Sequence, residues 1–346
     1  MTRHLITFLI GIEMKELIKR LVESYGPSGF EDAVRNVIRE EIAQYSDTLT
    51  VDTMGNLIAI KKGDGSGLRI MVAAHMDEIG IMVTHVTERG FLRFTNIGGV
   101  RPQALMGTRV RFANGIAGVI YCEKMDTWNK LLGQEQHYID VGAASKQECP
   151  VQVGWAASFD RSFEDLGGRY IAKSLDDRIG CAVAIEGLKR LASQDESAHD
   201  IYFVFSTQEE VGTRGAQAAA NALTVDIGLA IDVTMTGDTP ESETMAVKLG
   251  EGPAIKVKDR GMISHAGLVR QMRERAEEAE IPYQLEVLER GSTDARSIQI
   301  AGAGSAAGCI SIPSRYVHTP SEMVDAEDVE NAVQLLVAIL SNPIEL

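Results

Sequence analysis

The chain has 346 residues, of which 45% are hydrophobic and 24% are charged, the composition of an ordinary globular protein with about two structural units. Its formal net charge of -15 argues against nucleic acid or an anionic membrane as a partner. Four cysteines are scattered along the sequence without a CxxC pair. This pattern favours a reducing cytoplasmic location over a disulfide-stabilised secreted protein.

The first thirteen residues need separate treatment. An apolar run over residues 5–12 has the composition of a signal-peptide core. However, Glu13, Lys15 and Glu16 follow at once, no small-residue cleavage site is present, and the run is too short to span a bilayer. We expect regular helix from Met14 onward and interpret residues 1–13 as an N-terminal extension.

The next part of the chain alternates helices and strands. Two helical patterns occupy residues 14–45, separated by the turn sequence Gly26-Pro27-Ser28-Gly29. A β-hairpin is predicted over residues 48–61 with its turn at 54–56. An apolar strand over residues 68–74 then ends at His75 and Asp77.

The character of the sequence changes between about residues 83 and 168, where short β-like pieces alternate with glycine turns. Beyond residue 170 the patterns predict helices at 177–193, 213–222, 264–280 and 325–341, and strands at 200–206, 226–232 and 307–312. The simplest architecture is an α/β domain formed by residues 14–82 and 169–346. A small inserted β domain, residues 83–168, interrupts it.

Candidate metal ligands follow several of the predicted strands. A buried strand over residues 201–205 leads into the adjacent acids Glu209 and Glu210, which need a cationic partner if they are buried. The carboxyl ends of strands line the active crevice in open α/β sheets. The other candidates placed at or near strand ends are His75, Asp77, Asp176, Asp177, Asp232 and His318.

Two histidines and three carboxylates from this set would suit zinc, cobalt or manganese. Five side chains are too many for one catalytic tetrahedral zinc ion, but they fit two ions about 3.5–4 Å apart with one bridging carboxylate. Taken singly, each residue has a plainer explanation, such as helix capping by Asp176 or Asp177. Spacing alone does not decide between Asp176 and Asp177, or between Glu209 and Glu210.

Five motifs in order carry a family resemblance. They are residues 74–80 (AHMDEIG), 174–178 (SLDDR), 208–212 (QEEVG), 230–233 (AIDV) and 315–320 (RYVHTP). From Met14 onward the chain resembles the glutamyl/deblocking aminopeptidase family, tetrahedral metallo-aminopeptidases of the dizinc exopeptidase clan. The resemblance implies a mixed-sheet α/β catalytic domain, and residues 98–100 (GGV) with the β-rich stretch after them look like the PDZ-like insert of this family.

The resemblance also implies roles for individual residues. Asp176 would bridge two divalent ions (zinc or cobalt, with manganese possible), His75 and Asp232 would complete one site, and Glu210 and His318 the other. Glu209 would be the general base. Asp77 would orient His75, which is the usual carboxylate–histidine–metal arrangement.

The function implied is removal of N-terminal residues from short peptides with a free N-terminus, through attack by a metal-activated water. The resemblance further implies a cytoplasmic homo-dodecamer built from dimers. The main alternative is a carboxypeptidase or an N-acyl amino acid deacylase on the same scaffold. An endoglucanase would leave the two histidines unexplained, and a metal-binding structural protein would leave Glu209 without a role.

Overall fold

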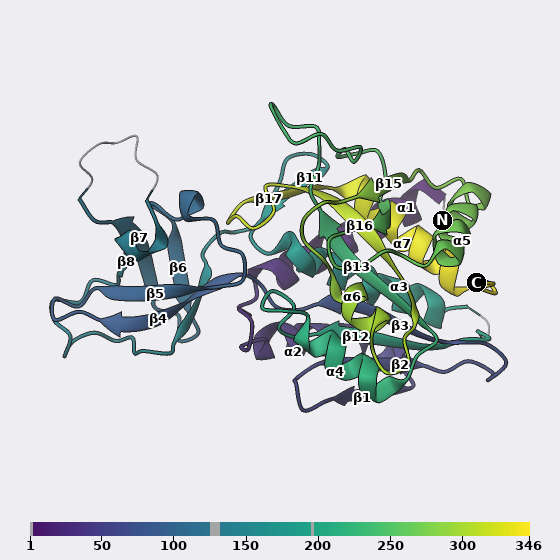
Figure 1. The fold of residues 1–346 in the computed structure, drawn as a ribbon, viewed down its shortest axis with the longest axis horizontal. Helices are drawn as coiled ribbons and strands as arrows, with labels where there is room; N and C mark the ends of the chain where they lie inside the picture. Colours follow the sequence, from purple (N-terminus) through teal and green to yellow (C-terminus); the bar gives the residue numbers. More distant parts are fainter. Residues whose placement is uncertain (1–2, 125–131, 195–196) are drawn as a thin grey trace.

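The computed structural model describes residues 3–124, 132–194 and 197–346. Eleven strands form a large mixed sheet, and six others close into an antiparallel barrel that lies to one side of it (Figure 1). None of the helices in the described ranges combines the length and apolar character that crossing a bilayer requires.

Four parallel strands form the centre of the large sheet. In spatial order they are β12 (Asp200–Ser206), β3 (Arg69–His75), β13 (Ile227–Thr234) and β16 (Ala306–Arg315). Along β3, Ile70 and Val72 pack into the core on one face, and Met71 and Ala73 pack into the core on the other. Burial on both faces explains why these strands read as continuous apolar runs.

Antiparallel strands extend both edges of this sheet. The hairpin of β1 (Thr48–Val51) and β2 (Leu57–Lys61) lies beside β12, so the predicted hairpin is confirmed. On the other side are β17 (Glu322–Asp325), β11 (Arg169–Ala172) and β10 (Glu164–Asp165). The strands β14 (Ala254–Lys258) and β15 (Gln284–Val287) branch from β16. The sequence patterns did not predict β14, β15 or β17.

Helices cover both faces of the sheet. One core includes side chains of α1 (Arg3–Glu23), α2 (Asp32–Ile42), α3 (Leu175–Ala192), α5 (Ala266–Glu278) and α7 (Ala326–Leu340). The opposite core includes side chains of α4 (Arg214–Leu223) and α6 (Asp294–Gln299). Short 3₁₀ turns occupy Ala43–Tyr45, Pro102–Ala104 and Gln134–Gln136.

The start of α1 corrects one expectation. The helix begins at Arg3, so the prediction that regular helix starts at Met14 is wrong. The apolar run over residues 5–12 contains no proline, the residue that most strongly breaks a helix, and the helix therefore continues through it. Residues 1 and 2 of the predicted extension lie outside the described ranges.

The barrel has its own hydrophobic core. Its strands close in the order β4 (Gly80–Val86), β5 (Leu92–Ile97), β8 (His137–Asp140), β7 (Ala117–Cys122), β6 (Arg109–Phe112) and β9 (Ala156–Phe159). Ile81, Val110, Phe112 and Ile139 are among the side chains that fill it. Because β4 follows β3 directly, the barrel begins next to the carboxyl edge of the large sheet.

The two-sided core gives a test of the fold. Ile70 is 0% exposed and Ile300 is 60% exposed. We expect Ile70→Ala to lower the free energy of unfolding by about 2–5 kcal/mol, because it leaves a cavity in the core. Ile300→Ala should change it by less than about 0.5 kcal/mol. Denaturant unfolding of both variants measures the difference, and equal losses would contradict the described packing.

Candidate active site

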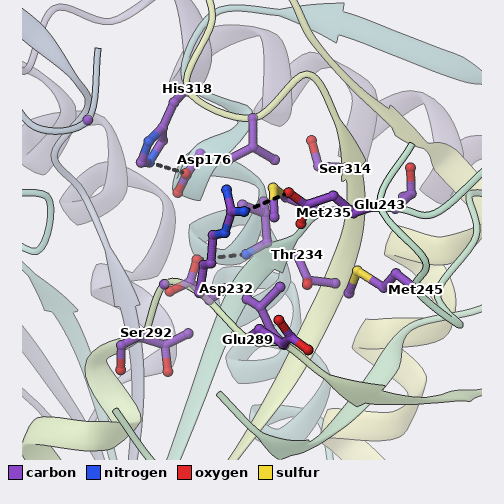
Figure 2. A pocket seen from close by; sticks show the side chains of 18 of the residues that line it. Asp176, Asp232, Thr234, Met235, Glu243, Met245, Glu289, Ser292, Ser314 and His318 are labelled. Atoms are coloured by element: carbon purple, nitrogen blue, oxygen red, sulfur yellow. Dashed lines mark hydrogen bonds and ion pairs between the residues drawn. The ribbon is translucent and has the colours of Figure 1, made fainter. Parts of the chain in front are cut away.

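The predicted site residues meet at the carboxyl edge of the parallel strands. They come from the end of β3 (His75), the beginning of α3 (Asp176), the turn after β12 (Glu209 and Glu210), the second half of β13 (Asp232) and the turn after β16 (His318). All but His75 line one open pocket of about 1160 Å³. Figure 2 shows the ring of His318 next to the carboxylate of Asp176, joined to it by a dashed line, with Asp232 lower in the view.

The carboxylate of Asp176 lies between two imidazoles. Its Oδ1 is 3.0 Å from Nε2 of His75, and its Oδ2 is 3.4 Å from Nε2 of His318. The same nitrogen of His318 is 3.3 Å from Oε2 of Glu210. In each of two groups, the potential ligand atoms all lie within 4.8 Å of one another: the first group is formed by His75, Asp176 and Glu210, and the second by His75, Asp177 and Asp232.

These donors fit a divalent metal ion. Two donor atoms bound about 2.1 Å from one tetrahedral zinc ion lie roughly 3.4 Å apart, close to the spacings around Asp176 and His318. In addition, Oε1 of Glu210 is buried and has no hydrogen-bond partner among the described residues. A buried acceptor of this kind is costly unless a cation or a donor satisfies it.

The pKa shifts of the buried carboxylates also indicate that the site binds a cation. Burial, together with the charge of Asp176, raises the pKa of Glu210 to about 7. Burial is also the main reason that the pKa values of Glu209 and Asp232 lie well above their usual range. Burial opposes ionisation of Asp176 too, but hydrogen bonds with His318 and His75 lower its pKa. The protein therefore gathers more buried carboxylates here than its two histidines compensate.

Asp176 and Asp177 make different contacts. Both carboxylate oxygens of Asp177 already accept backbone N–H groups, those of His75 at 3.1 Å and Gly180 at 3.1 Å. Its oxygens also come close enough to His75 and Asp232 to form a ligand group. Because its lone pairs serve the backbone while Asp176 faces both imidazoles, Asp176 fits the shared position between the histidines better.

Asp77 occupies the position expected for orienting His75. Its Oδ1 is 3.5 Å from Nδ1 of His75, and its backbone oxygen is 3.2 Å from the same nitrogen. Its carboxylate also accepts the backbone N–H groups of Glu209, at 2.9 Å, and Glu210, at 3.1 Å. The hydroxyl of Ser28 donates to it at 2.6 Å. One buried acid thus fixes both the imidazole and the acidic turn.

Glu322 is a site residue that the sequence reasoning missed. This buried side chain accepts the backbone N–H of Asp176 at 2.9 Å and that of His318 at 2.9 Å. It therefore joins the beginning of α3 to the turn after β16. Its position four residues after His318 could have indicated that Glu322 lies near the site. Nothing in the sequence shows that it reaches Asp176.

Removing this link gives a prediction. We expect Glu322→Gln to weaken Zn²⁺ binding about ten- to hundredfold, as loss of groups that orient ligands commonly does, because the amide replaces one acceptor oxygen. Glu327→Gln, at an exposed position nearby, is the matched control. Calorimetric titration of metal-depleted protein measures both variants. An unchanged affinity in Glu322→Gln would show that this carboxylate does not position the ligands.

Comparison with known proteins identifies the family. The sequence profile of the M42 glutamyl aminopeptidase family matches residues 55–335. A putative aminopeptidase of Acetivibrio thermocellus is 49% identical over 94% of this chain and 98% of its own length. An aminopeptidase structure from Desulfurococcus kamchatkensis superposes with a TM-score of 0.91 at 39% identity, covering 96% of this chain and 95% of that one.

A further relative is the TET1 peptidase of Pyrococcus horikoshii, which can assemble into a tetrahedron or an octahedral shell. It shares 34% identity with this chain, with a TM-score of 0.85 and coverage of 94% of this chain and 99% of that one. These matches extend over nearly the whole chain and include the sheet edge where the candidate ligands lie. The predictions of family and of enzyme class are therefore confirmed: the chain belongs to the M42 glutamyl aminopeptidase family and is an aminopeptidase.

Proposed function

We propose that this aminopeptidase uses two divalent metal ions to remove N-terminal residues from short peptides that have a free α-amine. The observation that carries the proposal is the position of Asp176. One of its oxygens faces His75 and the other faces His318, as expected for a carboxylate shared by two ions. Zinc or cobalt suits the mixed nitrogen and oxygen donors, and manganese is a third candidate.

Each ion would have its own set of ligands besides Asp176. His75 and Asp232 would complete one set, and Glu210 and His318 would complete the other. The ligand-atom group of His75, Asp177 and Asp232 supports the first set, and the 3.3 Å separation of His318 from Glu210 supports the second. The other group, His75 with Asp176 and Glu210, includes residues of both sets, as expected if they lie on either side of a shared Asp176. When bound, the ions would polarise the scissile carbonyl and lower the pKa of the attacking water.

Glu209 is the proposed general base. It lines the pocket and lies beside the proposed ligands, with its Oε2 3.9 Å from Nε2 of His75. Its backbone N–H is held by Asp77, which fixes the turn that carries it. Glu209 would take a proton from the attacking water and deliver it to the departing amine, a role for which a positioned carboxylate is well suited.

The family match supports an aminopeptidase over a carboxypeptidase. An aminopeptidase must recognise the free α-amine of its substrate, which is an ammonium cation at neutral pH. An N-acetylated substrate has no such cation. The requirement for a free α-amine therefore separates this proposal from a carboxypeptidase and from an N-acyl amino acid deacylase.

The domain organisation and assembly also belong to the proposal. The proposed division is a catalytic domain of residues 14–82 and 169–346 with a PDZ-like insert of residues 83–168. The closed barrel supports an insert at this place in the chain, although its strands run from Gly80 to Phe159 and β10 pairs with the large sheet. The tetrahedral assembly of the TET1 peptidase and the dodecamer of a second TET1 structure support a homo-dodecamer, which the family resemblance implies is built from dimers. A cytoplasmic location stays a prediction from the scattered cysteines.

Two neighbouring glutamates test the assignment of base and ligand. Glu209→Gln should keep the fold and the bound metal but lower kcat by about 10²–10⁴-fold, since the base is lost. Glu210→Gln should lower both metal content and kcat. Metal analysis and peptide assays of the two variants make the comparison. A Glu209→Gln enzyme with a near-normal rate would remove Glu209 from the role of base.

Metal removal tests the reaction class. Treatment with a chelator should abolish cleavage of aminoacyl substrates, and adding Zn²⁺, Co²⁺ or Mn²⁺ back should restore it. The matching N-acetylated substrates should stay uncleaved throughout, because they lack the cationic α-amine. Full activity in the presence of the chelator, or preference for the acetylated series, would rule out the proposed function.

A further inference from the structure

A loop of the barrel reaches the proposed metal ligands. Gly98 and Gly99 follow β5 and lie against the catalytic turns. A methyl group on Gly99 would lie 2.7 Å from Cε1 of the His318 ring and closer still to Nδ1. A methyl group on Gly98 would lie 2.9 Å from Oε2 of Glu210. Such distances are well inside normal contact, so neither position has room for a side chain.

The ring of His318 is restrained on one side by the contact with Gly99. Its backbone has a φ of +64°, a conformation unusual for a residue with a side chain, and its N–H is held by Glu322. Its Nε2 faces Asp176 and Glu210. Within the described ranges no hydrogen bond reaches its Nδ1. Gly99 therefore supports the side of the ring that no hydrogen bond fixes.

The barrel is also anchored near the other imidazole. The hydroxyl of Tyr25 donates to the backbone oxygen of Ala156 in β9 at 3.0 Å. At the start of β4, a methyl group on Gly80 would lie 3.1 Å from Cβ of Pro27, in the turn between α1 and α2. The same N-terminal turn carries Ser28, which donates to Asp77. These contacts fix the barrel, and with it the loop of Gly98 and Gly99, against the part of the protein that carries Glu210 and His318.

We propose that Gly98 and Gly99 are positioning residues through which the barrel holds Glu210 and His318 in place. The inference rests on the proposed dinuclear function and adds a role for the insert inside the catalytic centre. A side chain at position 99 would push the His318 ring away from Asp176. The ion held by Glu210 and His318 should then be lost first, while the ion at His75 and Asp232 should stay.

The test is titration of metal-depleted Gly99→Ala with Co²⁺, followed by calorimetry and by visible absorption of the bound ions. We expect the wild-type protein to bind two ions. The variant should bind one of them normally and the other at least tenfold more weakly, with kcat lowered more than KM is changed. Gly115→Ala is the control, because Gly115 in the same barrel has a φ of +86° and open space around it. That control adds backbone strain without touching the site.

A double variant shows whether Gly99→Ala acts by displacing the His318 ring or by disturbing the fold of the protein. If Gly99 acts through the His318 ring, Gly99→Ala should have little further effect on Co²⁺ binding once His318→Ala has removed that ring. Normal affinity for the second ion in Gly99→Ala would overturn this inference and leave the proposed function intact. A wild-type protein that binds no ions, or binds them without cleaving peptides, would instead overturn the proposed function.

Discussion

The repulsion among buried carboxylates at one sheet edge is the constraint on which the site depends. Asp176, Glu209, Glu210 and Asp232 are all buried or partly buried there. The two imidazoles and Lys256, whose charge acts on Asp232 but which already forms an ion pair with Glu286, do not balance these acids. Burying uncompensated charge is costly, and divalent cations remove that cost. The same ions would supply the chemistry that a peptide-bond hydrolase needs. Metal binding would therefore serve both the stability of the site and its catalytic function.

Three further carboxylates hold the site together through the backbone. Asp77, Asp177 and Glu322 each accept two backbone N–H groups, and for each at least one of the donors is a proposed ligand residue. These acids connect turns that belong to different strands and helices. Because the anchors bind the backbone, the functional side chains stay free to face the pocket. The carboxylates of this region therefore divide into those that face the pocket and those that fix its walls.

Much of this arrangement could be predicted from the sequence. The apolar runs of β3, β12 and β13 predicted buried strands, and the polar residues at their ends predicted a shared edge. The role of Glu322 could not be predicted, because its partner Asp176 lies 146 residues away along the chain. The sequence could not show that Asp177 accepts two backbone N–H groups, the observation that favours Asp176 as the shared ligand. β14 and β15 also lacked a sequence signal, since each is short and gains its partners only in the folded sheet.

Anomalous diffraction from crystals of the zinc-loaded protein tests the central claim most directly. The account predicts two peaks in the pocket, one between His75 and Asp232 and the other between Glu210 and His318, with Asp176 in contact with both. A single peak, or peaks that avoid these side chains, would contradict it.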